Sequence, residues 1–416
     1  MTHLPATFRL RPLSAAIMLA ALSANAAAVP VNWVPNADGF WDVGTNWSSN
    51  PALPGAADDV TIDVGGATVR TTTFRSGAVT INSLTSQENL ALSGGTLTIN
   101  GASTINAGFT QNGGTLGGAG NLTVSGASTL GSGVGTAITM TGAGTTRFDG
   151  TLDITGTGVH DFNGGRTLLA TGITTWSNAA GGNEGQIRLG TGSRIENQGL
   201  WIDNTSANSS INNNLGAGSF LNSATGVYQK TGASTVTIST VLTNDGALDV
   251  QNGTMVLSGG GALNGSLNVA TGSTLQVSGG TLALNSTSVG LNGRLQVSGG
   301  TVNQAGVLTP SGSGLVELGG GTLNIAGAVT AVNYTQNGGT LGGAGNLTVS
   351  GAASLGSAVG TGTTMTGAGT TRFNGALAII GSGVHDFSGG RSVVIVGPTT
   401  WTNAAGNEGQ LRLGFN

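Results

Sequence analysis

Two pairs of neighbouring residues are the part of this sequence best suited to acid–base chemistry. They are His160-Asp161 and His385-Asp386, each inside the motif Val-His-Asp-Phe. A histidine beside a carboxylate could move a proton, and an arginine such as Arg166 could hold an anion nearby. Adjacent residues of a strand point to opposite faces, however, so the two side chains of each pair are poorly placed to cooperate. We therefore expect no catalytic residue here, and a structural hydrogen bond or a bound anion instead.

A second candidate is a group of carboxylates near the start of the chain. Asp58, Asp59 and Asp63 could supply oxygen ligands to a calcium ion. They belong to neither a regular Asp-x-Asp-x-Asp-Gly loop nor a glycine-rich nonapeptide repeat. Solvated turn and cap residues are the favoured interpretation, so the sequence predicts no metal site and no cofactor, with these three aspartates as weak calcium candidates.

Two tryptophans at equivalent positions, Trp176 and Trp401, could stack against sugar rings. Filling of a core or of a surface gap is the simpler interpretation. We retain both residues as possible glycan contacts.

The composition excludes several classes of protein. Of 416 residues, 77 are glycine, only 7% are charged and none is cysteine. Disulfide scaffolds and thiolate metal sites are therefore excluded. The single lysine, Lys230, leaves no basic patch for a nucleic-acid backbone. With a net charge of −4 and 38% hydrophobic residues, the chain is also unlike a disordered polyelectrolyte.

Internal repetition is the main signal of the sequence. Residues 109–190 recur as residues 334–414, with one gap at Gly182. A finer period lies beneath, because Gly-Gly pairs followed by Thr or Ala keep returning. The steps between Gly261, Gly280, Gly300, Gly321 and Gly339 are 19, 20, 21 and 18 residues.

Short segments in which apolar and polar residues alternate follow these glycines. This alternation predicts strands with one buried face, separated by glycine turns. A unit of roughly 20 residues cannot close its own core, but stacked units can. The sequence therefore predicts an all-β parallel β-helix, a β-solenoid, over residues 64–416. An antiparallel β-sandwich is the alternative. Examples of such segments are residues 97–99, 122–124, 267–269, 275–277, 295–297, 323–325 and 347–349.

The segment 27–63 differs in composition and is predicted to cap the first coil with its tryptophans, because an open solenoid end invites aggregation. It resembles the opening segment of bacterial autotransporter passengers and filamentous-haemagglutinin-like β-solenoid surface proteins. The resemblance implies an exported, right-handed β-helix, usually an adhesin, without a catalytic residue. It rests on Gly39-Phe40-Trp41-Asp42, Asn46-Trp47-Ser48, Pro51, Pro54 and Asp58-Asp59-Val60-Thr61-Ile62.

Both ends of the chain carry predictions about export. Residues 1–26 have a basic start, a short apolar run and the sequence Ala24-Asn25-Ala26, which predicts a signal peptide for the Sec pathway. The second repeat copy stops at Gly414, where another coil would follow. We therefore expect a fragment of a longer autotransporter-like protein.

Together these features favour an exported bacterial cell-surface or secreted structural or adhesive β-helix protein with no catalytic activity. The expected partners are a host surface, glycan or matrix, and an outer-membrane transporter for secretion, but no nucleic acid. The expected location is extracellular or at the outer-membrane surface. A β-helical polysaccharide lyase or hydrolase is the alternative, and an ice-binding threonine array is a third hypothesis.

Overall fold

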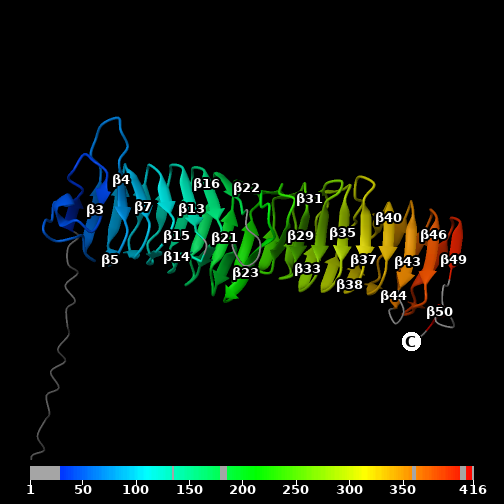
Figure 1. The fold of residues 1–416 in the computed structure, drawn as a ribbon. Helices are drawn as coiled ribbons and strands as arrows, with labels where there is room; N and C mark the ends of the chain where they lie inside the picture. Colours follow the sequence, from blue (N-terminus) through cyan, green and yellow to red (C-terminus); the bar gives the residue numbers. More distant parts are fainter. Residues whose placement is uncertain (1–28, 134, 179–184, 358–361, 403–408, 415–416) are drawn as a thin grey trace, which may run out of the picture.

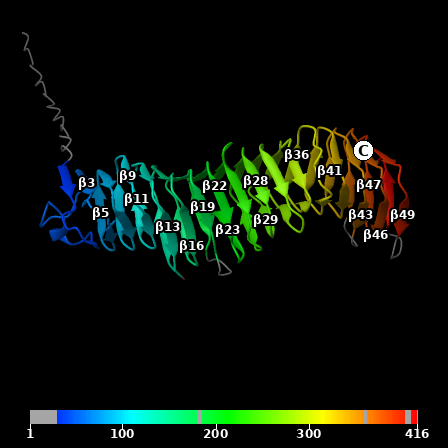
Figure 2. The ribbon, with the colours of Figure 1, turned by 90° about the horizontal axis from the view of Figure 1, so that it is seen from above.

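The protein is an elongated rod of stacked β-strands (Figure 1). The computed structural model describes residues 29–133, 135–178, 185–357, 362–402 and 409–414. The predicted signal peptide lies outside this range. Strands β1 to β50 make up the regular structure, with one 3-10 turn, η1 (Gly44–Asn46). The view from above in Figure 2 shows the same steady progress of the chain along the rod.

The strands form three long faces, which the chain visits in the repeating order I, II, III. Face I contains β1 (Val29–Asn32), β3 (Asp58–Ile62), β6 (Ser83–Ser86), β9 (Ser103–Ile105), β12 (Leu122–Val124), β15 (Thr145–Phe148), β18 (Thr167–Ala170), β21 (Arg194–Asn197), β24 (Ser219–Asn222), β27 (Val241–Asn244), β30 (Gly261–Leu263), β33 (Thr281–Leu284), β36 (Thr301–Gln304), β38 (Thr322–Ile325), β41 (Thr340–Gly342), β44 (Thr363–Met365), β47 (Val384–Phe387) and β50 (Gln410–Leu413).

Face II is built from two sheets that follow one another along the rod. The first contains β2 (Gly39–Phe40), β4 (Thr71–Phe74), β7 (Asn89–Leu92), β10 (Phe109–Gln111), β13 (Ser128–Ser132), β16 (Leu152–Gly156), β19 (Ile173–Trp176), β22 (Leu200–Asp203), β25 (Val227–Lys230), β28 (Ala247–Val250), β31 (Ser266–Val269) and β34 (Val289–Leu291). The second contains β39 (Val329–Ala331), β42 (Leu347–Val349), β45 (Thr370–Phe373) and β48 (Ser392–Ile395).

Face III completes each coil. It contains β5 (Ala78–Ile81), β8 (Thr96–Ile99), β11 (Thr115–Gly117), β14 (Ala137–Met140), β17 (Val159–Phe162), β20 (Ile187–Gly190), β23 (Ser209–Leu215), β26 (Thr235–Ile238), β29 (Thr254–Leu257), β32 (Thr274–Val277), β35 (Arg294–Val297), β37 (Leu315–Leu318), β40 (Asn333–Gln336), β43 (Ala353–Ser357), β46 (Leu377–Gly381) and β49 (Thr399–Thr402).

The core is a column of aliphatic side chains stacked one coil above another. Leu97 of β8 is in register with Leu116 of β11, and both are fully buried. The same holds for Val277 of β32 and Val297 of β35. Burying one such side chain stabilises the fold by about 1.5–3 kcal/mol. The predicted parallel β-solenoid is thus confirmed, and the antiparallel sandwich is wrong. The right-handed sense of the coil stays a prediction.

Glycine is required where the corners of successive coils touch. Gly300 has φ +64°, a left-handed conformation that side chains disfavour. A Cβ atom on Gly300 would also lie 2.5 Å from the carbonyl oxygen of Gly280 in the coil before. The recurring Gly-Gly pairs therefore mark corners where backbone lies directly on backbone.

Coil length varies more than the predicted step of about 20 residues. Registered residues are 18 apart between Thr322 and Thr340 but 27 apart between Thr167 and Arg194. The longer coils carry their extra residues at corners, because the strands themselves stay short. This variation explains why the period fades in the middle of the sequence.

Face II is interrupted once, in the segment 305–314. This segment contains Pro310 and forms only isolated parallel bridges, from Ser311 to Gly290 and from Leu308 to Val329. Proline has no N–H to donate to a ladder, which accounts for the missing strand. The bridges show that the two sheets of face II continue one another.

The duplicated segment lies on different faces in its two copies. Copy one begins in β10 on face II, whereas copy two begins in β40 on face III. Each later strand is displaced in the same way, so the second copy is rotated by one face about the rod axis. The rotation is possible because all three faces use the same strand length and the same inward alternation.

The N-terminal module shares the sheets of the coils. β1 pairs in parallel with β3 and thus extends face I. Three buried tryptophans pack together beneath it, with ring centroids 5.0 Å apart for Trp33 and Trp47 and 4.7 Å apart for Trp41 and Trp47. Trp41 also contacts Phe74 of the first full coil, at 5.7 Å. Within the described ranges, no helix has the length and apolar character needed to cross a membrane.

Candidate binding surface

The first histidine–aspartate pair is split between the core and the surface. His160 in β17 is fully buried, and its Nε2 lies 3.1 Å from the carbonyl oxygens of both Leu130 and Thr155. Asp161 faces the other way and accepts two hydrogen bonds from Arg188, at 2.6 and 2.7 Å. The expectation that the pair would point to opposite faces agrees with this geometry.

The second pair repeats this arrangement on another face. In β47, Nδ1 of His385 is 2.8 Å from Oγ1 of Thr363, while Asp386 binds Arg412 at 2.5 and 2.7 Å. Burial lowers the pKa of both His160 and His385, so both rings are neutral at neutral pH. The two histidines therefore act as core residues that hydrogen-bond to the corners.

The candidate arginine of the first pair lies in the core rather than beside the histidine. Arg166 donates to Oγ1 of Thr146 and to the carbonyl oxygens of Gly118 and Gly120. Burial lowers its pKa to about 10, which still leaves it charged at neutral pH. Its counterpart Arg391 contacts glycine carbonyls in the same way. These arginines fasten successive glycine corners from inside.

The three weak calcium candidates each serve a local turn or strand contact. Asp58 accepts from the backbone N–H of Gly55 at 2.7 Å, and Asp63 accepts from that of Gly65 at 3.1 Å. Hydrogen bonds from Ser83 and Asn82 lower the pKa of Asp59. Among the residues that the structure describes, no three His, Asp or Glu side chains are grouped so that they could hold a metal ion.

The two candidate sugar-stacking tryptophans differ sharply in exposure. Trp176 in β19 is fully buried, so it is a core residue and offers no ring to a glycan. Trp401 in β49 is 54% exposed. Only Trp401 stays a predicted glycan contact.

Three shallow hollows lie along one edge of the rod, where the chain passes from face II to face III. We call them the edge hollows. The first has a volume of about 450 Å³ and is lined by Gly272, Ser273, Thr274, Asn292, Gly293, Arg294, Ser313, Gly314 and Leu315. The second, of about 350 Å³, is lined by Gly135, Thr136, Ala137, Thr157, Gly158, Val159 and Arg188. The third, of about 360 Å³, is lined by Gly156, Thr157, Ser177, Asn178, Asn204 and Ser206.

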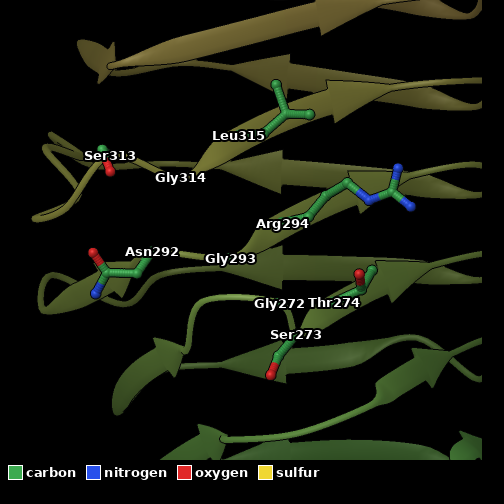
Figure 3. Close-up of a pocket in the computed structure, with 9 residues that line it drawn as sticks. All are labelled: Gly272, Ser273, Thr274, Asn292, Gly293, Arg294, Ser313, Gly314 and Leu315. Atoms are coloured by element: carbon green, nitrogen blue, oxygen red, sulfur yellow. The ribbon is translucent and has the colours of Figure 1, made fainter.

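Figure 3 shows how the first edge hollow is built from three successive coils. Ser273, Asn292 and Ser313 come from consecutive corners, and Arg294 extends along the strand that follows. The guanidinium of Arg294 donates to Oε2 of Glu317 at 2.7 Å, and Gln296 donates to Oε1 of the same carboxylate at 2.9 Å.

The chemistry of the edge hollows is that of hydrogen bonding. Each hollow offers hydroxyl or amide groups on a shallow surface. The two that contain an arginine, Arg188 and Arg294, have its charge balanced by a carboxylate of a neighbouring coil. Such a surface suits a polyhydroxylated, weakly charged chain better than a strongly anionic one.

Sequence analysis missed two features that the structure brings together. The edge hollows went unnoticed because their residues lie about one coil apart in sequence and are all common turn residues. A buried cluster of Asp203, Tyr228 and Lys230 also went unnoticed. Its one available signal was that Lys230 is the only lysine of the chain.

No protein-family model, curated protein or solved structure matches this chain.

Proposed function

We propose that this chain is an exported structural or adhesive rod of a bacterial surface, without catalytic activity, that binds glycan or matrix along its edge hollows. The observation that carries the proposal is the position of all three hollows on the edge between faces II and III. A row of similar weak sites on a stiff rod favours avidity for a long, repetitive ligand.

The ionisable side chains support a non-catalytic role. Asp161 is held by Arg188 on the surface, while His160 is hydrogen-bonded in the core. Glu317 is held in the same way by Arg294. Carboxylates engaged in ion pairs are poor general acids at neutral pH, because the paired cation favours the charged form.

Export and capping are part of the same proposal. A surface rod needs residues 1–26 as a signal and an outer-membrane transporter for secretion. It also needs a covered first coil, and the cluster of Trp33, Trp41 and Trp47 is suited to that role.

The binding part is tested with the full chain and polysaccharides immobilised on a biosensor. Doubly substituting Asn292→Ala and Arg294→Ala is expected to weaken binding several-fold. The matched control is Arg147→Ala, because Arg147 is a similarly exposed arginine paired with an acid, Asp149, but outside the hollows. Equal binding by both variants would remove the first edge hollow from the proposal.

Export and catalysis need separate measurements. Protease treatment of intact cells that express the full chain is expected to digest it, and a chain protected inside the cytoplasm would contradict export. The enzyme alternative predicts cleavage of polyuronates that is lost in Asp161→Asn. Product formation with that pattern would replace the binding role by catalysis.

A further inference from the structure

A carboxylic acid and an amine lie in neighbouring coils of the core. Asp203 ends β22 and Lys230 ends β25, and the two residues are direct partners in the parallel register of face II. Both are fully buried. Lys230 is the only lysine among 416 residues. A lone buried lysine stacked on a buried aspartate calls for a specific chemical role.

Both functional groups are directed to the same corner of the rod. The amine of Lys230 donates to the carbonyl oxygen of Gly232. Oδ1 of Asp203 accepts from the backbone N–H and the hydroxyl of Thr205, at 3.2 and 2.9 Å. The corners themselves touch, because the N–H of Gly232 donates to the backbone oxygen of Asp203 at 3.0 Å. Rotation of the lysine side chain therefore suffices to bring Nζ to the carboxyl carbon.

The surroundings of the pair are dry and aromatic. Trp201, Phe220 and Tyr228 pack around it, with ring centroids 5.3 to 6.3 Å apart. In the same inward column, Trp176 precedes Asp203 and Val250 follows Lys230. Burial raises the pKa of Asp203 and lowers that of Lys230, so the core favours a neutral acid beside a neutral amine. These are the forms that condense to an amide.

We propose that Lys230 and Asp203 join in an intramolecular isopeptide bond that links β22 covalently to β25. The lysine Nζ attacks Cγ of the protonated carboxyl, and a C–N bond forms. One C–O bond then breaks, and its hydroxyl takes a proton from the nitrogen and leaves as water. The product is one secondary amide and one water molecule, with no oxidant or reductant.

Groups already in place support this condensation. The hydroxyl of Tyr228 donates to Oδ2 of Asp203 at 3.1 Å, and Thr205 donates twice to Oδ1. These donors stabilise the negative charge that develops on the carboxyl oxygens during attack. Fixing both reactants in adjacent strands replaces a bimolecular step by an intramolecular one, and the apolar core disfavours the reverse attack by water.

Trypsin provides a local test on the full chain. Between Arg194 and Arg294, Lys230 is the only cleavage site. A free Lys230 gives the two peptides 195–230 and 231–294. An acylated Lys230 resists trypsin, so the denatured and digested protein is expected to give one peptide, 195–294, lighter than its sequence by one water molecule. Cleavage after Lys230 at unmodified mass would overturn the proposal.

Dehydration elsewhere is distinguished by the same digest. A succinimide at Asp203-Asn204 also loses one water, but it leaves Lys230 open to trypsin, so a lighter peptide 195–230 contradicts the isopeptide bond. Asp203→Ala is expected to restore cleavage after Lys230. The matched control is Asp249→Ala on the same face, which should keep the linked peptide. The wild-type digest decides the question even if Asp203→Ala fails to fold.

The role of the phenol is tested by Tyr228→Phe. This variant keeps the ring packing and removes the hydroxyl that touches Asp203. We expect a smaller linked fraction, which rises with incubation time because only the rate is affected. A linked fraction equal to that of the wild type at every time would remove Tyr228 from the proposed step.

Discussion

The indole of Trp176 is fully buried between two coils, whereas that of Trp401, its counterpart in the second repeat copy, is 54% exposed. Trp176 is in register with Ile154 on one side and Asp203 on the other. Trp401 has Ile379 as its registered partner. Equivalent residues of a duplicated sequence thus have different surroundings, and this difference can be measured.

Truncating the two tryptophans should have unequal effects. Trp176→Ala removes a large buried side chain and is expected to lower the free energy of unfolding by about 3–5 kcal/mol. Trp401→Ala removes a half-exposed ring and should change it by about 1 kcal/mol or less. Urea denaturation followed by circular dichroism measures both values. Similar losses for the two variants would contradict the buried position of Trp176.

The buried arginine should matter more than a surface arginine. Arg166→Met leaves the carbonyl groups of Gly118 and Gly120 without their side-chain donor, and we expect a loss of about 2–4 kcal/mol in the free energy of unfolding. Arg147→Ala breaks only an exposed ion pair with Asp149 and should cost about 1 kcal/mol or less. The urea midpoints of the two variants test this order, and a reversal would argue against the internal fastening of the corners.

Stability should fall as the solution is acidified through the range where histidine titrates. The folded state holds His160 neutral with a lowered pKa, whereas the unfolded chain titrates near the ordinary value of about 6.5. The unfolded state therefore binds more protons below this value. The stability contributed by His160 is complete above pH of about 6.5 and is lost as the pH falls toward 5, by at most about 1.4 kcal/mol per pH unit.

The measurement for this prediction is the urea midpoint between pH 7.5 and 5. His160→Gln should flatten the dependence, leaving the smaller part from His385, which has the same sign. The charged groups on the strand beside His160 are Asp161 and its partner Arg188, which stay ionised in this range as an ion pair. An unchanged slope in His160→Gln would show that another group is responsible.

The corner glycines should tolerate alanine only where there is space. Gly300→Ala meets both a positive φ of +64° and a carbonyl oxygen at 2.5 Å, so we expect a loss of more than about 1 kcal/mol. Gly306→Ala is the control, because a Cβ there meets nothing within 4 Å. Thermal unfolding of the two variants compares them, and an equally stable Gly300→Ala would show that this corner can open.

How much could be predicted differs between the fold and the site. The alternation in segments such as residues 295–297 is local, because it reflects which side chains one strand can bury, and it was sufficient to predict the parallel solenoid. The edge hollows depend on corners of three coils, so no single stretch of sequence contains them. The tryptophan pair shows the same limit, since both copies read alike but only Trp401 is exposed.

The sequence by itself determined the coil, because the glycine spacing sets where the chain turns and the alternation sets which side chains point inward. Tertiary structure alone decided what stands beside what. The missing strand at Pro310 advances the second copy by one face, and unequal corners bring Asp203 under Lys230. Neither could be read along the chain, because stacking joins residues that are a full coil apart, and the length of each coil is known only once the strands are in register.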